Sequence, residues 1–236
     1  MNFDSQGNII DKKTFSADAA KTFTAHVFAW MFGALLVTAA IAYAFANSSL
    51  IELMINETTH RPTPFFYISI FSPIAIILAM RFGFERMSML VMTALFALYS
   101  VLMGISLSVI FLAYDPMMLV KAFGMTAGVF AIMAVAGYTT KADLSRMGTI
   151  LIIALIAAVI VSVINIFMGS SQLSWILDLV FLAIFTGLVA YKMQMIREYG
   201  EHYGTSQPKM AVWMALSLYV TFINLFLTLL RLFSRR

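Results

Sequence analysis

The chain has 236 residues, of which 62% are apolar and only 11% are charged. Almost every residue beyond a polar start belongs to a long apolar run or a short connection, which leaves no room for a soluble catalytic domain. The net charge of +4 comes with bases at the ends of the apolar runs, which is a membrane-orientation pattern and not the one-sided basic face of a nucleic-acid-binding protein. These features predict an integral membrane protein that is not an enzyme and binds no nucleic acid.

Metal and thiol chemistry have no basis in this sequence. The chain contains no cysteine, so disulfides and thiolate metal sites are excluded. Its three histidines, His26, His60 and His202, are too far apart for a recognisable ligand spacing. We therefore expect no metal and no cofactor.

The first 21 residues form a polar segment with charges at Asp4, Asp11, Lys12, Lys13 and Asp18. The apolar run that follows is too long for the hydrophobic part of a cleaved signal peptide. We predict a cytoplasmic N-terminal tail over residues 1–21 and a transmembrane domain over 22–236.

The apolar runs between charge clusters have the length that a helix needs to cross a hydrocarbon core of about 30 Å. They are too continuous for the alternating pattern of a barrel, so we predict an all-α bundle of transmembrane helices. The seven predicted spans lie near 22–46, 64–81, 87–113, 119–138, 148–168, 175–196 and 210–233.

The distribution of bases predicts the orientation. With the N-terminus in the cytoplasm, ten of the 15 lysines and arginines lie inside and five outside. Three of those five, Arg231, Arg235 and Arg236, are near the C-terminus, and a re-entrant last segment would place them inside as well. Residues 210–233 hold no glycine or proline to turn on, so we predict a seventh span and an outer C-terminus.

Small residues and one proline predict how the helices pack. Pro73 should kink the second span, either as packing geometry or as a hinge. Gly124 and Gly128 form a GxxxG step, and Ser100, Gly104 and Ser108 form a ladder of small residues, two patterns that allow close helix contact. We expect both to serve packing within the chain more than dimerisation.

Polar and ionisable residues at membrane depth are the candidate functional groups, since their burial in lipid is costly. They are His26, Asp178, Lys192, Asn165, Thr221, Asn224 and Arg231. Each also has a simpler interpretation. His26 can lie at the interface instead of acting as a proton sensor. Asp178 can be a solvated acid in the first helical turn, and the two asparagines can be interhelical hydrogen-bond partners. Lys192 lies within one turn of the inner end, so its ammonium can extend to the interface or line a pore.

Several ordered blocks of sequence resemble one known family. The most specific is Gly137 to Ser145, GYTTKADLS, and further blocks are FTGLVAYKMQMI from Phe185 and SLYVTFINLFLTLLRLF from Ser217. Together with FTAHVFAWMFGALLVTAAIAY near the start, these blocks make the chain similar to bacterial members of the Bax inhibitor-1 family over its whole length.

The resemblance implies a seven-helix bundle with the last helix at its centre, a location in the bacterial inner membrane, and a pH-sensitive calcium leak. In members with that activity, two aspartates face each other between the sixth and seventh helices and share a proton. An arginine at the inner end of the second helix, here matched by Arg81, can act as their counter-charge. In this chain the two aspartate positions hold Lys192 and Thr221.

This departure leaves two functions open. The first is a cation leak with an altered or absent pH sensor, whose candidate residues are Lys192, Thr221, Arg81, Asn224, Asp178 and His26. The second is a non-conducting regulator of other membrane proteins, such as a modulator of a membrane-anchored protease. A lysine beside a pore repels calcium, and it repels Arg81 too unless Glu85, Glu198 or water intervenes, which favours the second function.

Overall fold

A computed structural model describes residues 2–3, 9–10, 12–55 and 61–234. Asp4, Asp11, His60, Arg235 and Arg236 lie outside these residues, and so do the expectations that rested on them. The side chains are described from residue 17 onward, apart from the same gap and C-terminus.

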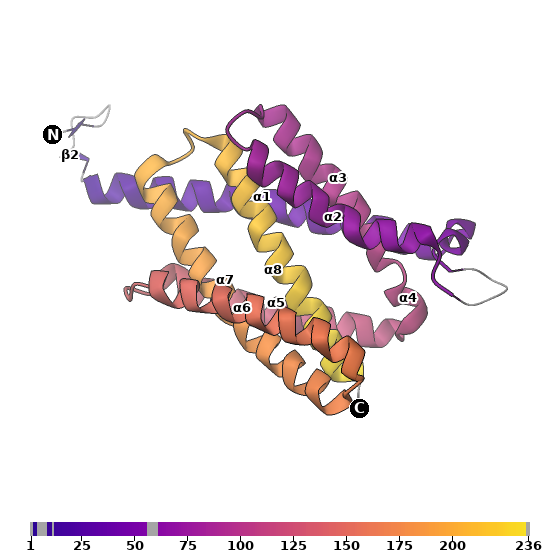
Figure 1. Cartoon of the computed structure of the whole chain (residues 1–236). Coiled ribbons are helices and arrows are strands. Elements are labelled where there is room, and N and C mark those ends of the chain that lie inside the picture. The colour runs from indigo at the N-terminus through magenta and orange to yellow at the C-terminus, as the bar shows by residue number, and fades with distance from the viewer. Residues whose placement is uncertain (1, 4–8, 11, 56–60, 235–236) are drawn as a thin grey trace. The chain divides into compact units, whose positions relative to one another are not determined.

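The described chain is all-α apart from one short pair of strands (Figure 1). Strand β1 (Asn2–Phe3) pairs with β2 (Ile9–Ile10) in antiparallel orientation. The helices are α1 (Lys12–Ala46), the 3-10 helix η1 (Ser49–Leu53), α2 (Pro64–Gly83), α3 (Met89–Leu107), α4 (Ile110–Ala113), α5 (Pro116–Thr139), α6 (Ser145–Met168), α7 (Ser171–Tyr203) and α8 (Pro208–Ser234).

Local sequence signals explain where several helices begin and end. Thr63 caps α2 ahead of Pro64, Ser88 caps α3, and Ser170 caps α7, each by accepting a hydrogen bond from a backbone amide in the first turn. Helix α6 ends at Gly169, whose φ of 65° is the left-handed conformation that glycine adopts without strain.

In the described part of the chain, seven helices are long and apolar enough to cross a membrane, which confirms the predicted all-α membrane fold with seven spans. Helix α8 is one continuous helix of 27 residues, so the last segment is not a re-entrant hairpin. Helix α1 begins at Lys12, and its membrane-spanning part begins at Ala17, earlier than the predicted start near residue 22.

The spans differ greatly in how much of them is buried. In α8, 67% of the most apolar window is inside the protein, compared with 11% in α6. Apolar side chains of α6 therefore face outward, where lipid can surround them. Helix α8 instead contributes a large share of the buried core. The central place of the last helix, which the family resemblance implies, stays a prediction.

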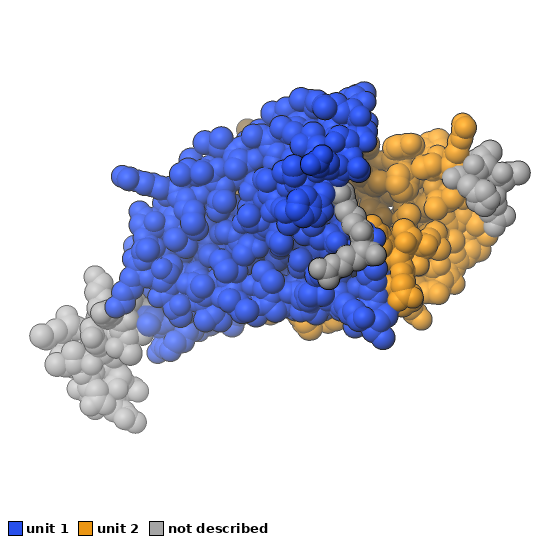
Figure 2. All heavy atoms as spheres, turned by 90° about the horizontal axis from the view of Figure 1, so that it is seen from below, with its two compact units in different colours: residues 1–26, 117–207, 217–236 blue, residues 27–116, 208–216 orange. Residues whose placement is uncertain are grey.

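The chain divides into two compact units (Figure 2). Unit 1 contains residues 1–26, 117–207 and 217–236, and unit 2 contains residues 27–116 and 208–216. Helices α1 and α8 each contribute to both units.

Unit 2 is held by close contacts between small residues. The Thr38 hydroxyl of α1 donates a hydrogen bond of 2.9 Å to the carbonyl of Ser100 in α3. A Cβ added to Gly104 would lie 2.8 Å from the Cβ of Ile41, so α1 and α3 approach each other here as the small-residue ladder predicted. Pro73 is buried inside α2, and its role as a hinge stays a prediction.

In unit 1 the glycine step that packs is not the predicted one. Gly124 and Gly128 are exposed on α5, and a Cβ at either position would have no described atom within 4 Å. The expectation that they pack within the chain is therefore wrong. The step that does pack is Gly200 and Gly204 at the C-terminal end of α7, where a Cβ on Gly200 would lie 2.8 Å from the Cα of Ala20.

Candidate functional site

Lys192 and Thr221 meet between α7 and α8 of unit 1. The Lys192 ammonium donates a hydrogen bond of 2.6 Å to the Thr221 hydroxyl and one of 2.9 Å to the carbonyl of Ser217. Thr221 is 2% exposed, and its own hydroxyl donates to the same Ser217 carbonyl. The lysine is turned toward α8, so the expectation that it extends to the inner interface is wrong.

The charge of Lys192 has no acidic partner in the described chain. The four ion pairs of the described residues involve Lys21, Arg197 and Arg231 as cations, and not Lys192. Both acceptors of the lysine are neutral. The site is thus a fixed positive charge held against a helix by neutral oxygens, a clear contrast with a pair of carboxylates that share a proton.

Asp178 is not the solvated first-turn acid that the sequence suggested. It is 4% exposed, and its carboxylate accepts a hydrogen bond of 2.8 Å from Nε of Arg231 in α8. The Arg231 guanidinium also donates to the Thr228 hydroxyl at 3.3 Å. A buried carboxylate needs such a partner, because an uncompensated charge in a low dielectric is costly.

The structure does not bring the other predicted residues into this pair of contacts. The amide of Asn224 donates to the carbonyl of Val220 in its own helix, so the predicted interhelical role is wrong for that residue. Asn165 does bond between helices, because its amide donates to the Ser174 hydroxyl of α7 at 2.7 Å. His26 is exposed on α1, and its role as a proton sensor stays a prediction.

Arg81 is exposed near the end of α2 and belongs to unit 2, whereas Lys192 belongs to unit 1. The predicted repulsion between these two cations stays a prediction. Glu198, which was expected to intervene between them, has its carboxylate 4.0 Å from the guanidinium of its neighbour Arg197.

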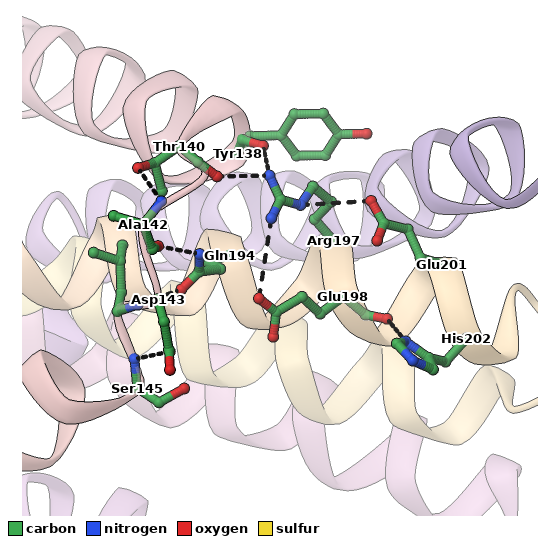
Figure 3. A network of polar contacts seen from close by, with 11 residues as sticks. Tyr138, Thr140, Ala142, Asp143, Ser145, Gln194, Arg197, Glu198, Glu201 and His202 are labelled. Carbon is green, nitrogen blue, oxygen red and sulfur yellow. Dashed lines mark hydrogen bonds and ion pairs between the residues drawn. The ribbon is translucent and has the colours of Figure 1, made fainter. Parts of the chain in front are cut away.

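Polar side chains in the C-terminal half of α7 hold the loop between α5 and α6 (Figure 3). The Gln194 side chain accepts from the amide of Leu144 and donates to the carbonyl of Ala142, both at 2.8 Å. Nη1 of Arg197 donates to the carbonyls of Tyr138 at 2.6 Å and Thr140 at 3.0 Å. Sequence reasoning missed both roles, since it treated Arg197 as an orientation signal only.

Lys209 does the same for the loop between α2 and α3 in unit 2. Its ammonium donates to the carbonyls of Phe84 at 2.6 Å and Met87 at 3.1 Å, and it lies 4.6 Å from the centre of the Phe84 ring. A cation is favoured there because carbonyls at the end of a helix have no partner within it. The one signal for the role of Lys209 in the sequence is its position just after the loop between α7 and α8.

Asp143 connects the loop between α5 and α6 to the first residue of α6. Its carboxylate accepts a hydrogen bond of 2.8 Å from the amide of Ser145, the first residue of α6. Hydrogen bonds from the Ser145 side chain and backbone, with the nearby charge of Arg146, hold the pKa of Asp143 below its usual value.

The segment that these residues fix, from Gly137 to Ser145, is the most specific of the blocks that predicted the family. Residues 20–236 match the protein family described as inhibitor of apoptosis-promoting Bax1. The chain belongs to the Bax inhibitor-1 family. It is a multi-pass membrane protein of that family, as its seven apolar helices and its inner-membrane relative agree.

Relatives within the Bax inhibitor-1 family match along nearly the whole chain. Inner membrane protein YbhL of Escherichia coli K12 is 38% identical over 221 residues, which cover 92% of each chain. An uncharacterised protein of Borreliella burgdorferi is 38% identical over 217 residues, covering 91% of this chain and 92% of its own. One from Deinococcus radiodurans is 33% identical over 221 residues, covering 93% of each.

Proposed function

We propose that this protein is a Bax inhibitor-1 type calcium leak that Lys192 keeps closed. The observation that carries the proposal is the pair of hydrogen bonds from the Lys192 ammonium to Thr221 and Ser217. The family resemblance assigns positions 192 and 221 to the aspartate pair of conducting members. Here the same positions join α7 to α8 through a cation and a hydroxyl.

Two physical effects support closure. A fixed positive charge beside a narrow path repels calcium, which carries two charges of the same sign. The Lys192 ammonium also uses two of its three N–H donors in hydrogen bonds to α8. Separation of α7 from α8 would therefore leave a buried cation without its acceptors. Neither Ser217 nor Thr221 is an acid, so no shared proton exists to switch the contact with pH.

The test is calcium entry into liposomes that contain the purified protein and a calcium dye, measured from about pH 6 to 8. The unmodified protein should admit little calcium at any pH in that range. The double variant Lys192→Asp with Thr221→Asp should admit calcium in a pH-dependent manner, because two close carboxylates attract the ion and share a proton.

A matched double variant, Lys192→Met with Thr221→Val, removes both hydrogen bonds of the Lys192 ammonium without adding carboxylates. It should admit more calcium than the unmodified protein and at a similar rate across this pH range, because the repelling charge and its contact with α8 are gone and no carboxylate is present to titrate. Strong pH-switched flux through the unmodified protein would overturn the proposal, since it would require a sensor elsewhere.

The second candidate is a non-conducting regulator of membrane proteins, for instance a modulator of a membrane-anchored protease. The same lysine favours it, because a sealed contact between α7 and α8 is compatible with a surface that only binds partners. A double aspartate variant that folds and still admits no calcium would decide for the regulator.

A further inference from the structure

Helices α7 and α8 are joined at two separate levels, and each joint includes one charged side chain of α7. Asp178 and Lys192 are 14 residues apart on α7, which is about 21 Å along the axis. Their partners on α8, Arg231 and Thr221, follow in the opposite order because the two helices are antiparallel.

Two joints fix a geometry that one joint cannot. A single hydrogen-bonded contact leaves one helix able to pivot and slide against the other, whereas a second contact about 21 Å away fixes both the crossing angle and the axial register. The Lys192 contact depends on this register, because a hydrogen bond to Thr221 weakens sharply beyond about 3.2 Å.

The outer joint is well suited to fix that register. The Asp178 side chain is only 6% exposed and the Arg231 side chain is 43% exposed, so water weakens their attraction from the arginine side alone. The guanidinium is held from a second side by the Thr228 hydroxyl, and Thr228 itself is fully buried. The Arg231 guanidinium is therefore fixed in orientation by two side chains, unlike the arginine of an isolated surface ion pair.

We propose that Asp178 and Arg231 are positioning residues that set the register of α8 on α7, so that Lys192 reaches Ser217 and Thr221. Breaking the outer ion pair then releases the inner hydrogen bonds, although the two lie about 21 Å apart. The inference takes the closing role of Lys192 from the proposed function, but the contact itself can be measured without any flux.

The test uses the chemical reactivity of the Lys192 amine in the full-length protein in liposomes. A membrane-permeable amine-reactive reagent is applied, and the modified fraction of each lysine is read by peptide mass spectrometry. Lys209 is the internal reference, because its ammonium is also hydrogen-bonded to backbone carbonyls but belongs to unit 2.

The variant Asp178→Asn should raise the reactivity of Lys192 relative to Lys209 by about tenfold, the size expected for two sites coupled through packed structure. The variant Glu52→Gln is the matched control, because it makes the same chemical change at an exposed outer position and should alter neither lysine. General destabilisation would raise both lysines together, which would contradict a positioning role.

Two further variants keep the test decisive if Asp178→Asn folds poorly. Arg231→Lys keeps the charge and should raise the Lys192 reactivity less than Arg231→Gln does. Equal effects of these two, or no effect of either, would overturn the proposal. The two proposals can fail separately. If Asp178→Asn raises the Lys192 reactivity but the Lys192 and Thr221 double aspartate variant admits no calcium, the positioning role is supported and only the calcium leak is refuted.

Discussion

The N-terminal and C-terminal halves of α7 are attached to their neighbours by different forces. The N-terminal half uses an ion pair between the buried Asp178 and the partly exposed Arg231. The C-terminal half uses hydrogen bonds from Lys192, Gln194 and Arg197 to neutral oxygens, and Arg197 also pairs with Glu198 and Glu201. The Asp178 contact joins opposite charges, whereas Lys192 carries a charge that no acid in the described chain offsets.

This difference shows that a charged residue in a membrane helix can be satisfied in two ways. In the Asp178–Arg231 pair the carboxylate is the buried member, so loss of the arginine removes a partner from a buried charge. A lysine on neutral acceptors can be replaced by an apolar side chain of similar length, which removes the charge together with its need for partners. Substitutions on the two levels should therefore have unequal costs.

The largest expected effect separates these two levels. Arg231→Gln removes the guanidinium from the buried Asp178 carboxylate and should reduce stability by about 1–3 kcal/mol, because the arginine is partly exposed and water offsets part of the loss. Lys192→Met should change stability by less than about 1 kcal/mol, because the lost hydrogen bonds are offset by removal of a buried charge. Thermal unfolding of both variants in the same detergent measures the difference, and equal losses would contradict the distinction between the levels.

A smaller effect sharpens the comparison at the C-terminal end of α7, where the contact is apolar. Gly200→Ala places a Cβ 2.8 Å from the backbone of Ala20 and should cost about 1–3 kcal/mol through overpacking. Gly124→Ala is the matched control on α5, where nothing described lies within 4 Å, and it should leave stability unchanged. Equal losses of thermal stability in the two variants would mean that the exposed step of Gly124 and Gly128 also packs.

The smallest effect concerns the loop between α5 and α6, which the C-terminal half of α7 holds. The folded-state pKa of Asp143 is depressed, so its capping contact stabilises the protein above the ordinary aspartate pKa and is lost as pH falls through the folded value. The stability difference between the unmodified protein and Asp143→Asn should therefore shrink toward zero in acid. A difference that stays constant with pH would show that the charge of Asp143 plays no part.

Much of the fold could be predicted from the sequence because hydrophobicity along the chain is sufficient to locate membrane spans. All seven predicted spans lie on helices that are long and apolar enough to cross a membrane. The errors are at the helix ends, as where α7 continues to Tyr203, beyond the predicted end at 196. Gly200 and Gly204 lie in that overlooked part, so the glycine step there was missed.

The sequence by itself determined the membrane class, the number of spans and the family resemblance, and it has Lys192 and Thr221 at the positions where that resemblance predicts aspartates. Each of these depends on residue type or on short-range order. Only the tertiary structure decided that Lys192 turns to Thr221 and that Asp178 is buried against Arg231, a partner 53 residues away along the chain. A charged side chain in a span must find a partner, but the helix that supplies this partner is fixed by packing and not by local sequence.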